Sequence, residues 1–295
     1  MSKHSKQQSA PVPAVIVTHL GVAVEIEGDG PRRVVRVPRK SGFVVGDQVL
    51  VGENDRLTLV PRRTELLRRA AGGGVHVVAA NLDVLFVVAA VDPPARAGLV
   101  DRAAVAARSS GIEPVLIINK ADLPDEEGVI AAMSSRASEM TVVLTSANSG
   151  QGIDELAALL AQKGRGALVG PSGVGKSSLF NRLVPEADLN TRALSPATGA
   201  GRHTTTTSTL HRLAGGGEVV DTPGVREFGL VDVAPADLAA WFPGFAVVVE
   251  GCRFRDCLHE AEPDCMIKRA VDEGRVQGSR YTAYRNLLAE LKGSG

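Results

Sequence analysis

One eight-residue stretch constrains the fold of this chain more than any other. Residues 170–177 read G-P-S-G-V-G-K-S and fit the pattern G-x-x-x-x-G-K-[ST] of a phosphate-binding loop. The apolar run at 167–169 can end a buried strand, and residues 178–183 carry apolar side chains at helical spacing. Glycines in such a turn let backbone N–H groups converge on phosphate oxygens at the start of the helix. The stretch therefore predicts an α/β domain that binds a nucleotide.

The loop supplies most of the expected phosphate contacts. Lys176 would reach the terminal phosphates, and the Ser177 hydroxyl would ligate Mg²⁺. The full set that we assign to phosphate binding is Gly170, Pro171, Ser172, Gly173, Val174, Gly175, Lys176, Ser177 and Ser178.

Two short motifs earlier in the chain favour guanine as the base. The run at 114–118 reads as a buried strand and leads into Asn119-Lys120-Ala121-Asp122. The Asp122 carboxylate can accept hydrogen bonds from guanine N1–H and the exocyclic amine, whereas adenine would leave it unpaired. Asn119 would tie this loop to the phosphate-binding loop, and Lys120 would lie along the base. A second strand ends before Ser146-Ala147, where a backbone N–H can bind the guanine O6.

The order of these motifs is unusual, because the base-reading residues precede the phosphate-binding loop. Downstream, residues 218–224 form a strand that ends in D-x-P-G, so that Asp221 would hold Mg²⁺ through water and Gly224 would sense the γ-phosphate. Thr205, in the threonine-rich segment before it, would close on Mg²⁺. The expected sheet is that of a GTPase, cut and rejoined elsewhere.

Short strands and helices fill the rest of the α/β pattern. We expect a parallel sheet with further strands at 82–91 and 141–144 and helices at 99–110, 126–138 and 153–162. Before it, five short strands suggest an oligonucleotide-binding (OB) type β-barrel: 14–17, 22–26, 33–37, 48–51 and 57–60. Residues 31–69 hold ten basic side chains against four acidic ones, which suits an RNA backbone or simply a solvated surface.

The three cysteines of the chain lie close together near its C-terminal end. Cys252, Cys257, His259 and Cys265 have the spacing C-x₄-C-x-H-x₅-C. Three thiolates and one imidazole suit a closed tetrahedral zinc site, which would be structural. Helical segments at 266–271 and 281–291 would follow it.

Taken together, the motifs and their order resemble the RsgA (YjeQ) family of circularly permuted GTPases, which act in maturation of the small ribosomal subunit. The resemblance covers about residues 14–291 and includes the guanine motif, the phosphate-binding loop, 201–205, 221–224 and the cysteine/histidine cluster. It implies a monomer with Zn²⁺ and Mg²⁺ that binds GTP, the 30S subunit and 16S rRNA. Four segments follow: a disordered tail at 1–13, the barrel at 14–64, the GTPase domain at 65–231 and a helical zinc-binding domain at 232–295.

The position that carries a water-orienting glutamine in Ras-like enzymes is Val225 here. His203 is therefore the best local candidate for positioning the attacking water, as the resemblance also implies, and the alternative is a loop histidine without a chemical role. No apolar run reaches transmembrane length and the polar N-terminus lacks a signal-peptide core, so we expect a cytoplasmic protein. Two alternatives remain open: an ATP-using phosphotransferase, and an RNA-binding assembly module that holds GTP without hydrolysing it.

Overall fold

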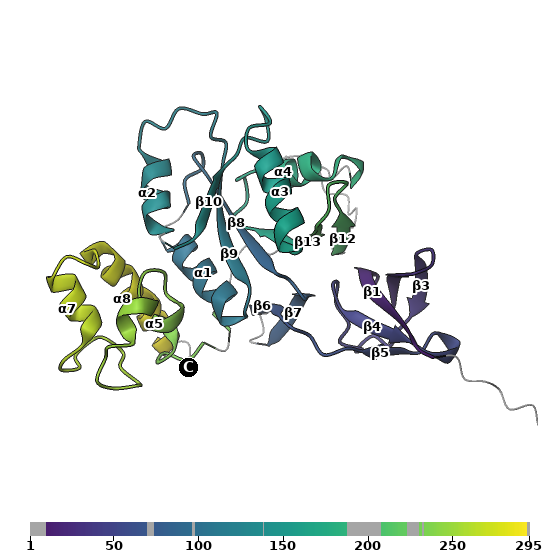
Figure 1. Ribbon diagram of the computed structural model, residues 1–295, viewed down its shortest axis with the longest axis horizontal. Coiled ribbons are helices and arrows are strands. Elements are labelled where there is room, and N and C mark those ends of the chain that lie inside the picture. The colour runs from purple at the N-terminus through teal and green to yellow at the C-terminus, as the bar shows by residue number, and fades with distance from the viewer. Residues whose placement is uncertain are drawn as a thin grey trace, which may run out of the picture.

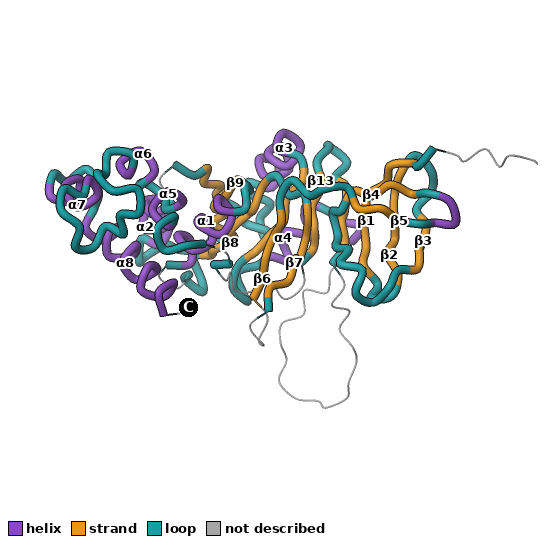
Figure 2. The backbone as a smooth tube through the Cα atoms, turned by 90° about the horizontal axis from the view of Figure 1, so that it is seen from below, coloured by secondary structure: helices purple, strands orange, loops and turns teal. Residues whose placement is uncertain are grey.

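A mixed β-sheet runs through the central and N-terminal parts of the molecule (Figure 1). The computed structural model describes residues 10–69, 74–95, 98–137, 139–187, 208–222, 230–231 and 233–293. Within these ranges the strand order is β10-β9-β8-β11-β13-β12-β1-β2-β3, with β4 joined to β1 and β5 joined to β4. The α/β part lies in the middle, with the N-terminal strands at one end and the C-terminal helices at the other (Figure 2).

Five parallel strands form the centre of the α/β part: β8 (Val84–Ala90), β9 (Glu113–Asn119), β10 (Thr141–Leu144), β11 (Arg165–Val169) and β13 (Glu218–Asp221). Helices α3 (Ile153–Lys163) and α4 (Lys176–Leu183) pack against one face. Helices α1 (Leu99–Ser109) and α2 (Val129–Arg136) cover the other. Every residue of β8 is buried, as a strand covered on both faces requires.

The sheet is not purely parallel, which corrects the sequence prediction. Strand β12 (Thr209–Arg212) runs antiparallel to β13, and its other edge pairs with β1 through Thr18 and Thr209. The N-terminal strands therefore continue the sheet of the α/β part. The sequence did not predict β12, and the direction in which strands pair is set by non-local contacts that hydrophobic periodicity does not report.

The five predicted N-terminal strands are present and pair antiparallel: β1 (Val12–His19), β2 (Ala23–Gly28), β3 (Arg33–Arg36), β4 (Gln48–Val51) and β5 (Leu57–Leu59). A short 3₁₀ turn, Glu53–Asp55, connects β4 and β5. Alternate side chains of these strands, such as Ile16, Val24 and Val49, enclose a small apolar core.

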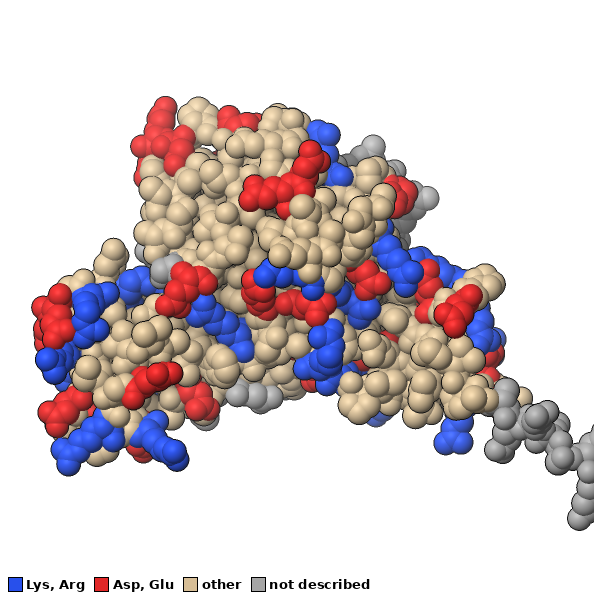
Figure 3. Space-filling view, viewed as in Figure 1, with Lys and Arg blue, Asp and Glu red and all other residues tan. Residues whose placement is uncertain are grey.

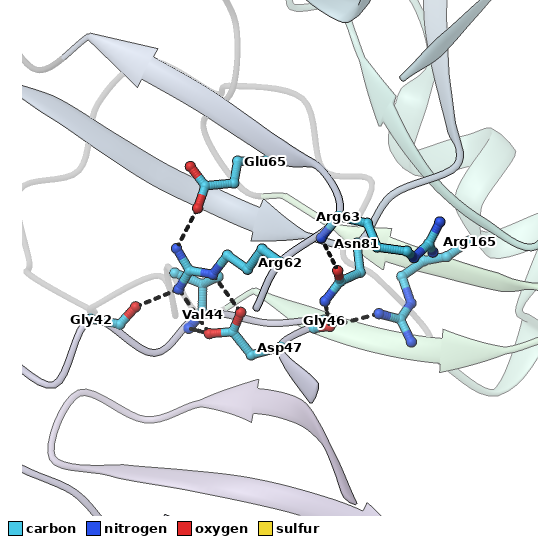
Figure 4. A network of polar contacts seen from close by, with 9 residues as sticks. All are labelled: Gly42, Val44, Gly46, Asp47, Arg62, Arg63, Glu65, Asn81 and Arg165. Atoms are coloured by element: carbon cyan, nitrogen blue, oxygen red, sulfur yellow. Dashed lines mark hydrogen bonds and ion pairs between the residues drawn. The ribbon is translucent and has the colours of Figure 1, made fainter. Parts of the chain in front are cut away.

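A polar network fastens these strands to the α/β part (Figure 4). The buried Asp47 carboxylate accepts hydrogen bonds from Arg62 Nε at 2.6 Å and Nη2 at 2.9 Å. The neighbouring Gly46 carbonyl accepts from Asn81 Nδ2 at 2.9 Å and from Arg165 Nη1 at 2.7 Å. Gly46 has φ +91°, and a Cβ there would lie 2.2 Å from the Ala80 carbonyl oxygen, so glycine is required. Arg62 precedes a two-stranded antiparallel sheet of β6 (Glu65–Arg69) and β7 (Val75–Ala80), which the sequence did not predict.

The C-terminal part is helical: α5 (Leu238–Trp241), α6 (Ala246–Val249), α7 (Met266–Asp272) and α8 (Gly278–Gly293). Its core contains three aromatic rings in contact, those of Phe242, Phe245 and Tyr284, and it includes Val105 of α1. This part therefore packs on the α/β part through α1. No helix among the described residues is long and apolar enough to cross a membrane.

Candidate nucleotide and metal sites

The phosphate-binding motif forms the predicted turn between a strand and a helix. Strand β11 ends at Val169, the loop follows, and α4 begins at Lys176. Gly170 has φ +148°, and a Cβ there would come within 2.2 Å of the Val88 carbonyl oxygen. The Lys176 ammonium donates to the carbonyl oxygens of Gly170 at 2.8 Å and Pro171 at 2.5 Å. These two contacts hold the ammonium group against the first two residues of the loop.

Asn119 joins the phosphate-binding loop to the two loops that the sequence predicts to read the base. The residue is 1% exposed at the end of β9, and its Nδ2 donates to Val174 O at 2.8 Å. Its Oδ1 accepts from Thr145 Oγ1 and from the Ala147 backbone N–H, each at 3.2 Å. A Cβ on Gly175 would lie 2.3 Å from Asn119 Nδ2, so this contact also depends on glycine. The tie predicted from the sequence is present, and it reaches both loops.

The expected base-reading carboxylate lies at the surface of the same edge. A hydrogen bond with the Ser146 side chain is the main cause that lowers the pKa of Asp122, and Asn148 adds to it with Nδ2 at 3.4 Å from Asp122 Oδ2. Lys120 adopts φ +61° and donates from Nζ to Asp92 O at 2.6 Å. Asp122 is thus kept ionised and able to accept from two donors of a base.

Asp221 ends β13, the strand adjacent to β11, on the edge that carries the phosphate-binding loop. Burial raises the pKa of its carboxyl to about 6. The next hydroxyl, Thr222 Oγ1, is buried without a hydrogen-bond partner among the described residues. The other predicted switch residues, His203, Thr205 and Gly224, lie outside the described residues.

The three cysteines and His259 come together in the C-terminal part. Their ligand atoms all lie within 4.8 Å of one another, and the His259 ring is fully buried. His259 Nδ1 is 3.6 Å from Cys252 Sγ and 3.4 Å from Cys265 Sγ. Burial lowers the pKa of His259, which keeps the imidazole neutral, as a metal ligand must be. The donor set and its spacing can hold one metal ion.

Backbone contacts fix the loop that carries His259. Tyr281 Oη donates to His259 O at 2.6 Å, and Tyr284 Oη donates to Leu258 O at 3.1 Å. The Glu262 carboxylate accepts from the N–H groups of residues 258, 260 and 261 at 2.8, 2.8 and 3.1 Å. Such contacts around a metal site hold the ligands in place.

Comparison with known proteins decides the family. The family model described as RsgA GTPase matches residues 59–231. The chain belongs to the RsgA GTPase family. It is 41% identical over 293 residues to the "Small ribosomal subunit biogenesis GTPase RsgA" of a Pseudomonas fluorescens strain, covering 94% of this chain and 85% of that protein. The protein of the same name from Azotobacter vinelandii is 41% identical over 292 residues, with 94% and 85% covered.

Two solved structures share the fold of this RsgA GTPase family member. YjeQ from Thermotoga maritima superposes with a TM-score of 0.76 at 30% identity and covers 96% of this chain and 99% of its own. YloQ, titled a circularly permuted GTPase, gives 0.72 at 26% identity over 100% and 99%. The order of elements agrees, because β8, β9 and the guanine motif precede β11 and its loop. The family and the permuted GTPase fold inferred from the motifs are confirmed.

Several residues at these sites were missed by the sequence analysis. Arg182 contacts the second base-reading loop, Asp92 holds Lys120, and Tyr281 and Tyr284 hold the metal loop. In each of these contacts a side chain donates a hydrogen bond to a backbone carbonyl oxygen. Carbonyl groups are present at every position, so no pattern of side chains could have indicated these contacts.

Proposed function

We propose that this protein binds GTP with Mg²⁺ and hydrolyses it on the 30S subunit during late assembly of that particle. The observation that carries the proposal is Asn119, whose side chain joins the phosphate-binding loop to two loops suited to guanine. A Lys-containing phosphate loop alone would fit ATP equally well. The printed name of the curated relatives, small ribosomal subunit biogenesis GTPase, supports the choice of particle.

The residues of the nucleotide site then take distinct roles. Lys176 and the backbone N–H groups of 172–178 bind the phosphates, and Asp122 accepts from guanine N1–H and the amine. Ser177 would ligate Mg²⁺, and Asp221 would hold it through water. Thr205 would be a further ligand of Mg²⁺, and Gly224 would sense the γ-phosphate. Mg²⁺, when bound, offsets the charge that develops on the phosphate oxygens. His203 positions the attacking water.

We assign the metal of the Cys252, Cys257, His259 and Cys265 cluster as one structural Zn²⁺. Three thiolates and one imidazole are a closed donor set for that ion, without a position left for substrate. The two tyrosines of the chain, Tyr281 and Tyr284, both anchor the cluster's loop to α8, which fits a role in folding this part.

The N-terminal strands are proposed as an OB-type barrel over 14–64 that contacts 16S rRNA, ahead of a GTPase domain at 65–231 and a zinc-binding domain at 232–295. Of its basic side chains, Arg32, Arg33, Arg62 and Arg63 form ion pairs with nearby carboxylates. In Figure 3 the basic side chains are interspersed with acidic ones on the face shown. RNA contact would therefore use the remaining exposed arginines. The ribosomal role in the printed name of the relatives supports work in the cytoplasm, and we further propose that the protein acts as a monomer.

The decisive experiment measures GTP hydrolysis by the protein alone, with 30S subunits and with 50S subunits. We expect stimulation by 30S only. Lys176→Ala serves as the matched inactive variant, because the phosphate charge loses its main side-chain partner. Equal rates in all three conditions would reject the ribosomal role. Tight GTP binding without hydrolysis in any condition would reject the GTPase activity and favour an assembly module that binds GTP without hydrolysing it.

A further inference from the structure

Arg182, in the last turn of α4, reaches the second base-reading loop. Its Nε donates to Ala147 O at 2.7 Å, and its Nη2 donates to Asn148 O at 2.9 Å. The guanidinium has its donors in a fixed planar fork, which suits two successive carbonyl groups. Helix α4 begins at Lys176, so one short helix bears the phosphate-binding lysine at its start and this contact near its end.

The two carbonyls belong to the segment that would read the base. The Ala147 N–H lies 3.2 Å from Asn119 Oδ1, so Ala147 is held by Asn119 on its amide side and by Arg182 on its carbonyl side. The Asn148 side chain in turn reaches Asp122 Oδ2 at 3.4 Å. Arg182 therefore holds the backbone of the residue that supports the base-reading carboxylate.

The other hydrogen bonds within this loop join its own residues, and none of them ends on the carbonyl oxygen of Ala147 or Asn148. Ser146 N donates to Gln151 O at 3.0 Å, and Gly150 N donates to Ser146 O at 2.8 Å. Ser149 N donates to Ser146 Oγ at 3.0 Å. These bonds shape a turn, but the contact from Arg182 sets where Ala147 and Asn148 lie relative to α4.

We propose that Arg182 is a positioning residue for guanine recognition. By holding the carbonyls of Ala147 and Asn148 it presents the Ala147 N–H to the guanine O6 and keeps Asn148 beside Asp122. The inference deepens the proposed GTP function and rests on it. If this backbone is ordered before the nucleotide binds, less conformational entropy is lost on binding, and the affinity is higher.

The test compares three nucleotides that differ only in the base. GDP carries the O6 acceptor, and IDP keeps O6 but lacks the exocyclic amine. The 2-aminopurine riboside diphosphate keeps the amine but lacks both O6 and the N1–H. Affinities are measured on the full-length protein by competition with a fluorescent GDP, together with ADP. The variants are Arg182→Ala and Arg182→Lys. Arg269→Ala in α7 is the control, because it also removes an exposed arginine charge, one that pairs with Glu273.

We expect Arg182→Ala to lower the affinity for GDP and for IDP by about 3- to 10-fold, because two exposed charge-assisted hydrogen bonds are lost. Binding of the 2-aminopurine nucleotide should weaken less than that of GDP, because it offers nothing to the Ala147 N–H and keeps only the contact of its amine with Asp122. Lysine can engage one carbonyl and should restore part of the loss. The control should match the wild type for all nucleotides.

Other outcomes overturn the inference in distinguishable ways. An equal loss for all three nucleotides would mean that Arg182 acts on the phosphate-binding helix, and no loss would make it a surface contact without a role in binding. If the wild type binds ADP as tightly as GDP, the proposed GTP function itself fails. Melting temperatures of each variant show that the fold is retained.

Discussion

A buried ion pair between two helices should control how firmly the C-terminal part holds the α/β part. Asp101 of α1 is 1% exposed and Arg280 of α8 is 8% exposed. Arg280 Nη1 donates to Asp101 Oδ1, and Nη2 donates to Pro243 O at 3.0 Å. The guanidinium also lies over the Phe242 ring at 4.7 Å. We choose Asp101→Ala as the perturbation because it removes only the carboxylate.

The expected cost follows from what remains around Arg280. Without Asp101 the buried guanidinium keeps one carbonyl and one aromatic face, and leaving a buried charge unpaired costs about 3–5 kcal/mol. Asp101 Oδ2 already lacks a hydrogen-bond partner among the described residues, so the pair is incompletely compensated. The double change Asp101→Leu with Arg280→Met should therefore recover most of that loss, to within about 1–2 kcal/mol of the wild type.

The same two helices provide a matched control. Arg102 and Glu290 also pair between α1 and α8, but their side chains are 26% and 47% exposed. Arg102→Ala should cost less than about 1 kcal/mol, because surface pairs contribute little. Urea unfolding is followed by fluorescence of Trp241, the single tryptophan, which belongs to α5 beside α1. If Asp101→Ala costs no more than Arg102→Ala, the buried pair does not hold this interface and the reasoning is wrong.

Four further outcomes are expected. Asp122→Asn should weaken GTP by about 10²-fold or more and favour xanthine nucleotides, because an amide can donate to the 2-oxo group; unchanged relative affinities in competition binding would remove its base-reading role. Cys257→Ser, or chelation, should lower the melting temperature of the C-terminal part while GTP binding persists, and elemental analysis of fresh protein must find zinc. His203→Ala should bind GTP normally but lose about 10²-fold or more of 30S-stimulated single-turnover cleavage; normal cleavage would end its catalytic assignment. Burial raises the folded-state pKa of Asp221 from 3.8 to about 6, so ionising this carboxyl lowers the stability of the fold above about pH 6, and this cost vanishes below about pH 4. Asp221→Asn should therefore raise the melting temperature of the nucleotide-free protein at about pH 8 but not at about pH 4. A rise of the same size at both pH values would contradict this.

The sequence determined the parts of this protein that depend on local spacing. The turn at Gly170–Lys176, the residues Asn119 and Asp122 after a buried strand, and the cysteine spacing around His259 are each set within a few positions of the chain. Their order along the chain was enough to indicate a permuted GTPase, and the family comparisons confirm it. The central strands and helices followed for the same reason, since hydrophobic periodicity is local.

Only the tertiary structure decided how these parts are joined. The pairing of β1 with β12, the Arg182 contact with Ala147 and the Arg280 pair with Asp101 link residues that are far apart in the chain, the last by 179 positions. Two of these contacts end on backbone carbonyls or backbone strand edges, which every residue type offers, so no side-chain pattern marks them. The third looks in the sequence like two ordinary surface charges. It is the packing of α8 on α1 that buries them and makes the pair significant.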